Sequence, residues 1–163
     1  MMDEKNNTQV QIEAMDRVLL ATRSNELISV NMGQAAIDWR DIPLSQKMDT
    51  ISLDINEGIL KNPVAVNVGN PHMVFFVKNI EDYDLKKIGP EVENHELFPE
   101  KCNVTLAQVL NKNLIKVKVW ERGAGLTKAC GTAACATAVA GNIKTLIDKN
   151  TDIEFALGKL TIF

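Results

Sequence analysis

Apolar and polar residues alternate along many short stretches of this chain, and this alternation predicts β-strands with one buried side. The stretch that ends at Trp120-Glu121 shows it most clearly, because lysines and apolar residues take turns there. Similar patterns recur before and after it. We expect strands at residues 8–14, 18–21, 27–32, 51–53, 64–68, 73–77, 102–110, 116–121, 152–155 and 159–163.

One segment departs from this alternation and predicts a buried helix. Residues 131–148 contain no proline, alanine dominates their first half, and no charged residue lies between Lys128 and Lys144. A helix that is apolar on all sides is buried in a core. A second helical segment, interrupted near Gly89-Pro90, is expected at residues 84–94. Many short strands around one buried helix favour an α+β fold over a parallel βαβ array.

The densest candidate chemistry lies where the strand at 116–121 leads into this helix. The sequence from Glu121 to Ala136 is ERGAGLTKACGTAACA, and it places Cys130 at the helix start. Free N–H groups and the positive end of the helix dipole favour a thiolate there and can also hold a substrate carboxylate. The alternative is an ordinary buried cysteine. That interpretation fits Cys135, among alanines, better than Cys130.

Two further positions invite a choice between a functional and a structural interpretation. Pro71 forces an extended residue before it and removes a backbone donor, so Asn70 and His72 are placed at a rigid loop end. From these residues alone, a turn with a surface histidine is the favoured interpretation. Cys102 stands where an apolar residue is expected, and we interpret it as a core thiol.

Length and composition limit the classes of protein. The 163 residues suffice for one domain with a real core, expected over residues 1–163 after a flexible start at Met1–Asn7. The net charge of −3, without a basic block, argues against nucleic acid or an anionic membrane as partner. No apolar signal core or stretch of ~20 apolar residues occurs. Three cysteines without paired spacing favour reduced thiols, and hence a cytoplasmic location.

The motifs together resemble the second half of diaminopimelate epimerase. The similarity rests on Glu121–Ala136 and on Gly69-Asn70-Pro71-His72, with support from Val30–Gly33 and Cys102–Val104, and it runs from about Val10 to Phe163. The resemblance implies strands rolled into a barrel around a central helix, with two such barrels facing each other across the substrate. It also implies cofactor-independent interconversion of LL- and meso-diaminopimelate, a step in lysine and cell-wall precursor biosynthesis. Pyridoxal phosphate is not used.

The resemblance assigns roles to individual residues. Cys130 becomes one of two acid–base groups, Glu121 the partner of its thiol, and His72 a neighbour of the catalytic cysteine in the first half. The expected substrate-binding residues are Asn70 and Asn103 at the distal end of the substrate, Glu121, Arg122 at the distal carboxylate, and Gly131 and Thr132 at the helix start. The alternatives are a solvated charge pair for Glu121 and Arg122 and a self-bonded strand-edge asparagine for Asn103.

The resemblance also has gaps. In members of the family, the first half of the chain carries a cysteine–glycine–asparagine–glycine motif. That motif is absent here: Cys102 is the only cysteine before Cys130, and no glycine follows it. Two interpretations follow. The chain is half of an epimerase that is inactive alone and needs a first-half domain or a homodimer partner, or it is a non-catalytic remnant or binding domain. A metal-binding protein is a poor third hypothesis, since no Cys-x-x-Cys or paired histidine spacing exists.

Overall fold

The computed structural model describes residues 8–14, 17–58 and 60–163, and it divides the chain into two compact units, residues 1–34 and 35–163. Each unit is described by itself. The expected flexible start at Met1–Asn7 lies outside the described residues, and the single domain over 1–163 stays a prediction. No helix in the described residues is long and apolar enough to cross a membrane.

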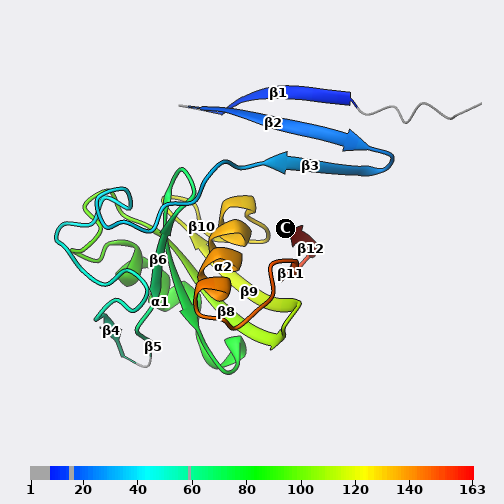
Figure 1. Cartoon of the computed structure of the whole chain (residues 1–163). Coiled ribbons are helices and arrows are strands. Elements are labelled where there is room, and N and C mark those ends of the chain that lie inside the picture. Colours follow the sequence, from blue (N-terminus) through cyan, green and yellow to red (C-terminus); the bar gives the residue numbers. More distant parts are fainter. Residues whose placement is uncertain (1–7, 15–16, 59) are drawn as a thin grey trace, which may run out of the picture. The chain divides into compact units, whose positions relative to one another are not determined.

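The first unit is a three-stranded antiparallel sheet (Figure 1), formed by β1 (Thr8–Ala14), β2 (Arg17–Ser24) and β3 (Leu27–Asn31). Val10 pairs with Ala21, which in turn pairs with Val30, so one face of the sheet gathers apolar side chains. Val10 is 53% exposed and Ile28 is 70% exposed. The strands predicted at 8–14, 18–21 and 27–32 are confirmed, and β2 is longer than expected.

The second unit is organised around a mixed sheet. Its strands are β6 (Val64–Asn67), β7 (Pro71–Phe76), β8 (Asn103–Asn111), β9 (Leu114–Glu121), β10 (Gly125–Thr127), β11 (Thr151–Phe155) and β12 (Gly158–Ile162). They run in the order β12, β11, β9, β8, β7, β6, and β10 also pairs with β9. The β7–β8 and β9–β11 pairs are parallel and the others antiparallel. A separate small ladder joins β4 (Asn56–Glu57) and β5 (Leu60–Lys61).

Helix α2 (Gly131–Ile143) lies across one face of this sheet (Figure 1). Its small side chains let it approach the strands closely, and Ala133, Ala136 and Ala140 are fully buried. The predicted buried helix is confirmed, but it ends at Ile143 and not at Asp148. Thr145 takes a positive φ of 56°. The chain therefore leaves the helix there.

The opposite face of the sheet is covered by α1 (Leu85–Glu93) and by the loop that precedes β4. Leu85 and Val92 of the helix pack there with Phe75 and Leu106 of the sheet. The expected interruption near Gly89-Pro90 is wrong, because α1 continues through both residues. The side chain that packs closest at that point is Trp120, whose ring would overlap a Cβ at Gly89.

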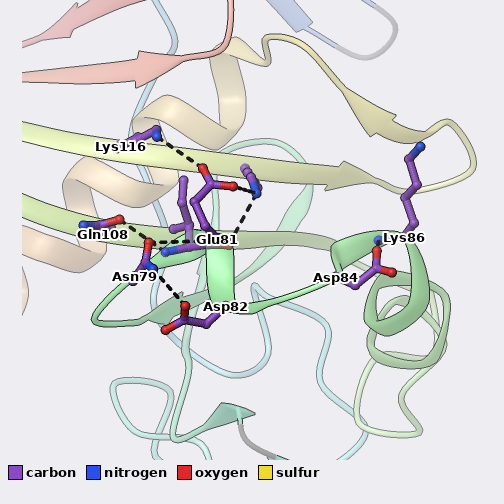
Figure 2. Close-up of polar contacts among 9 residues, drawn as sticks. Asn79, Glu81, Asp82, Asp84, Lys86, Gln108 and Lys116 are labelled. Carbon is purple, nitrogen blue, oxygen red and sulfur yellow. Dashed lines mark hydrogen bonds and ion pairs between the residues drawn. The ribbon is translucent and has the colours of Figure 1, made fainter.

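A polar cluster fixes a short 3-10 helix, η1 (Ile80–Asp82), to strands β8 and β9 (Figure 2). The Glu81 carboxylate accepts hydrogen bonds from Lys118 Nζ at 2.6 Å and from Lys116 Nζ at 3.2 Å. These two bonds lower the pKa of Glu81. Gln108 Oε1 accepts from the backbone N–H of Ile80 at 3.2 Å. The cluster is exposed and contains none of the predicted site residues.

The α+β class is confirmed, with one helix buried against the sheet as expected. Among the described residues the strands form open sheets and do not close into a barrel. The strand expected at 51–53 is wrong. Leu53 is fully buried, but it belongs to a loop, and its N–H donates to the Pro63 carbonyl. Apolar residues at that point serve packing and not a strand ladder.

Candidate active site

Cys130 is the residue that immediately precedes α2, as the sequence predicted. Its backbone is extended, with φ −152° and ψ 115°, and its carbonyl accepts the first helical hydrogen bond from Ala134 at 3.1 Å. The residue is 9% exposed, and its Sγ lies 3.3 Å from Thr132 Oγ1. Gly131 follows directly, and a Cβ built there meets nothing within 4 Å. The helix start therefore leaves open space at the side of Gly131 where a side chain would stand.

The pKa of the Cys130 thiol is raised from its usual value. Burial is the largest cause, and the Glu121 carboxylate adds to it by hydrogen bonding to the thiol and by its negative charge. The Thr132 hydroxyl and the Ala133 N–H act in the opposite direction. The helix start therefore acts in the expected direction, toward the thiolate, while burial and Glu121 act against it and the pKa is raised overall.

Glu121 reaches this thiol because of the alternation along β9. Val117 and Val119 belong to the core under α2, whereas Trp120 packs on the α1 side. Successive side chains of a strand point to opposite faces, so Glu121 lies on the α2 face with Val119. Glu121 is half-buried and its carboxylate raises the pKa of Cys130, which favours a role at the site over a merely solvated charge.

Asn70 and His72 are joined to the thiol by a chain of side-chain contacts. Asn70 Nδ2 donates to Thr132 Oγ1 at 3.4 Å, and Asn70 Oδ1 lies 2.9 Å from His72 Nε2. His72 is fully buried in β7, so it is not the surface histidine of a simple turn. Burial, and after it the charge of Arg122, lowers the pKa of His72 to about 3. The imidazole is therefore neutral at physiological pH.

Asn103 ties two parts of the site together through its amide. It is 3% exposed, its Nδ2 donates to the Pro71 carbonyl at 3.1 Å, and its Oδ1 accepts from the Arg122 N–H at 3.0 Å. The interpretation that Asn103 bonds its own backbone is wrong, because both partners lie in other segments. The Arg122 guanidinium donates to the Glu100 carbonyl at 2.7 Å and is exposed.

Sequence reasoning missed a buried acid that bonds to the segment around Glu121 from the opposite face of the sheet. Glu93, the last residue of α1, is 6% exposed and accepts hydrogen bonds from Trp120 Nε1 and from the Gly123 N–H. A signal for it exists in the sequence. Glu93 lies eight positions after Leu85 and so falls on the apolar stripe of the helix, where a charge needs a partner.

The other cysteines lie apart from this chemistry. Cys102 is fully buried, its Sγ contacts the Val92 carbonyl at 3.8 Å, and burial raises its pKa strongly. This confirms the core thiol. Cys135 is half-buried on α2 and packs against the core under that helix.

No cluster of His, Cys, Asp and Glu suited to a metal ion occurs among the described residues. A surface hollow by Tyr83, Lys86 and Lys118 contains none of the site residues.

Two solved structures share the fold of this chain. A predicted epimerase from Pseudomonas aeruginosa superimposes with a TM-score of 0.60 at 14% identity, over 98% of this chain and 60% of the other. A probable proline racemase from Agrobacterium radiobacter superimposes with a TM-score of 0.59 at 13% identity, over 99% of this chain and 57% of the other. At these identities the likeness shows the fold alone.

Comparison of sequences is more specific. The family model for diaminopimelate epimerase matches residues 64–162. A diaminopimelate epimerase of Pelagibacter ubique is 63% identical over 144 residues, which are 85% of this chain and 52% of that protein. One from the Wolbachia of Brugia malayi is 45% identical over 99% of this chain and 63% of that protein. The chain thus spans between half and two thirds of these relatives, and it belongs to the diaminopimelate epimerase family.

Proposed function

We propose that this chain supplies the Cys130 acid–base group of a two-base diaminopimelate epimerase. The reaction interconverts the LL and meso isomers without a cofactor. One group removes the α-proton from one face of the substrate carbon, and a second group returns a proton to the opposite face. The observation that carries the proposal is the setting of Cys130, a nearly buried thiol at a helix start whose pKa is controlled by Glu121 on one side and Thr132 on the other.

These neighbours suit a group that alternates between thiol and thiolate. We infer that Cys130 rests as a thiol, because burial and Glu121 raise its pKa, and that it serves as the proton donor. When its proton moves to the substrate carbanion, the Thr132 hydroxyl and the Ala133 N–H stabilise the thiolate that remains. In the reverse direction that thiolate removes the α-proton. Glu121 favours return to the thiol, so neither the thiol nor the thiolate is stabilised so strongly that the proton cannot move back.

The substrate carboxylate belongs at the open start of α2. The α-proton of an amino acid is very weakly acidic, so the negative charge that develops on removal needs donors already in place. The N–H groups of Gly131 and Thr132 begin the helix and favour an anion. Gly131 lies beside open space, whereas a larger residue would occupy it. Asn70 and the Arg122 guanidinium are our candidates for the distal end of the substrate.

The second acid–base group has to come from outside this chain. Cys102 is fully buried on the other side of the sheet, and Cys135 packs against the core. His72 is also fully buried, and its Nδ1 is enclosed by this chain. We propose that the first-half domain supplies the second group, and that the chain is inactive without that domain.

Complementation tests the proposal. The chain is mixed with the separately produced first half of the Pelagibacter ubique relative, and chiral separation follows conversion of LL- to meso-diaminopimelate. We expect conversion only when both halves are present. Cys130→Ala should lower it by roughly 100-fold or more, whereas Cys135→Ala serves as the matched control on the same helix. A folded mixture of both halves that binds diaminopimelate but does not convert it would favour the binding-domain alternative.

A further inference from the structure

Glu93 stands out because a carboxylate with little access to solvent requires partners. It ends α1, on the face of the sheet opposite Cys130, and is 6% exposed. Its Oε2 accepts from Trp120 Nε1 at 2.7 Å, and its Oε1 accepts from the Gly123 N–H at 3.0 Å. A buried carboxyl group is retained only where donors satisfy it. Both of its donors belong to the segment that carries Glu121 and Arg122.

That segment is a tight turn between β9 and β10, and its backbone N–H groups can be accounted for one by one. The Arg122 N–H donates to Asn103 Oδ1, the Gly123 N–H donates to Glu93 Oε1, and the Ala124 N–H donates to the Glu121 carbonyl at 3.0 Å. Gly123 has a φ of 74°, which a glycine adopts without strain. Two of the three bonds therefore come from side chains of other elements.

The two donors of Glu93 lie on either side of Glu121. Trp120 precedes Glu121 and packs on the α1 side, where its ring lies so close to Gly89 that a Cβ there would overlap it. Gly123 follows two residues later. Adjacent residues of a strand point to opposite faces. The hydrogen bond that fixes Trp120 on the α1 face therefore directs Glu121 to the other face. That other side carries α2 and Cys130.

From this arrangement we propose that Glu93 is a positioning residue, which fixes the turn at residues 121–124 so that the Glu121 carboxylate stays against the Cys130 thiol. The inference deepens the proposed function, on which it rests for the role of Cys130. Glu93 touches neither the thiol nor the open space beside Gly131. It acts through Trp120 and Gly123, and it does so from the helix on the far face of the sheet.

The geometry explains why a carboxylate is needed and an amide is not enough. Two N–H donors converge on this side chain, so both of its oxygens must accept. A glutamine of the same shape offers one acceptor and one NH₂ donor. In Glu93→Gln, the NH₂ group must face either the indole N–H or the Gly123 N–H. One of the two hydrogen bonds is then lost, and the turn at residues 121–124 is no longer fixed at the point where that bond was made.

The test reads the Cys130 thiol directly and requires neither substrate nor a second polypeptide. The alkylation rate of Cys130 by iodoacetamide is measured against pH in the full chain, in a Cys135→Ala background. Because Glu121 raises the pKa of Cys130, Glu121→Gln should lower the apparent pKa. Glu93→Gln should lower it in the same direction, and the double variant should shift it no further than Glu121→Gln alone.

The control is Glu91→Gln, an exposed acid two positions earlier on the same helix, which should leave the apparent pKa unchanged. A Glu93→Gln variant that folds and keeps the parent value, or whose shift adds to that of Glu121→Gln, would overturn the proposal. Amide exchange in the unaltered chain gives a second reading that needs no variant. The Gly123 N–H and the Trp120 indole N–H should both be protected, and exchange at unprotected rates would overturn the proposal equally.

Failure of this proposal can be told apart from failure of the proposed function. A chain that never epimerises diaminopimelate still reports whether Glu93 controls the Glu121–Cys130 pair, since alkylation depends only on the thiol. Conversely, if the chain is active as an epimerase but the pKa of Cys130 does not change in Glu93→Gln, the proposed function holds and the positioning role of Glu93 is wrong.

Discussion

The Nε2 atom of His72 lies 2.9 Å from the Oδ1 atom of Asn70, and this contact determines the form of the imidazole. An amide oxygen only accepts, so Nε2 carries the proton and Nδ1 presents a lone pair. The amide NH₂ of Asn70 then faces Thr132 Oγ1, which lies beside the Cys130 thiol. A fully buried histidine thus sets the orientation of the side chains that lead to the candidate acid–base group.

Stability should fall with acidity because of His72. Its pKa is about 3 in the folded chain, against an ordinary value of 6.5. Between these two pH values the imidazole is protonated in the unfolded chain and neutral in the folded chain. The free energy of unfolding should therefore rise with pH between these values, by at most about 1.4 kcal/mol per pH unit from this group. Urea unfolding across that range measures the slope. His72→Gln should flatten it, His95→Gln should not, and equal slopes in all three chains would refute the assignment.

Thr132 should control the ionisation of Cys130. Its hydroxyl lowers the pKa of the thiol, so Thr132→Val, which keeps the shape and removes the hydroxyl, should raise that pKa. Alkylation of Cys130 at neutral pH then becomes slower. Thr132→Ser retains the hydroxyl and is the matched control. Faster alkylation in Thr132→Val would show that access to the thiol, and not its ionisation, limits the rate.

Asn103 should contribute to stability as well as to the site. The substitution Asn103→Leu removes the partners of the Pro71 carbonyl and the Arg122 N–H. Loss of the buried bond to Pro71 should cost roughly 1–3 kcal/mol, and loss of the part-buried bond to Arg122 should cost less. Thermal and urea unfolding measure this loss. Asn142→Ala, at an exposed position of α2, is the control and should change little. An Asn103→Leu variant as stable as the parent would mean that solvent satisfies both backbone groups.

Two glycines should respond in opposite ways to a single methyl group. At Gly89 a Cβ would overlap the Trp120 ring, so Gly89→Ala should destabilise the chain by roughly 1–3 kcal/mol even though alanine favours helix. At Gly131 a Cβ meets open space, so Gly131→Ala should leave stability unchanged or raise it by up to about 1 kcal/mol. With the first half present, Gly131→Ala should instead weaken substrate binding. If Gly131→Ala binds the substrate as tightly as the parent does, the substrate carboxylate must bind somewhere other than the start of α2.

Local patterns in the sequence predicted the parts of this structure that depend on local physics. Alternation located β8 and β9, and a run of small uncharged residues located α2 and put Cys130 at its start. The end of α2 could not be predicted, because the positive φ of Thr145 is not the conformation that a β-branched residue normally favours.

The missed features depend on residues far apart in the chain. The place of Glu93 on the apolar stripe of α1 indicates burial, but its partners lie 27 and 30 positions away and cannot be found from a local pattern. The ionisation of Cys130 could not be predicted for a similar reason. The helix start is local and was predicted, whereas the burial and the Glu121 carboxylate that raise the pKa of the thiol are tertiary.

The central claim is that Cys130 exchanges a proton with the α-carbon of diaminopimelate. The most direct measurement is deuterium incorporation at that carbon in heavy water, with both halves present. The account predicts meso product that carries solvent deuterium at the inverted carbon, with Cys135→Ala equal to the parent and Cys130→Ala without meso product. Deuterated meso product formed equally fast by Cys130→Ala would contradict the account, because another group would then be the acid–base residue of this half.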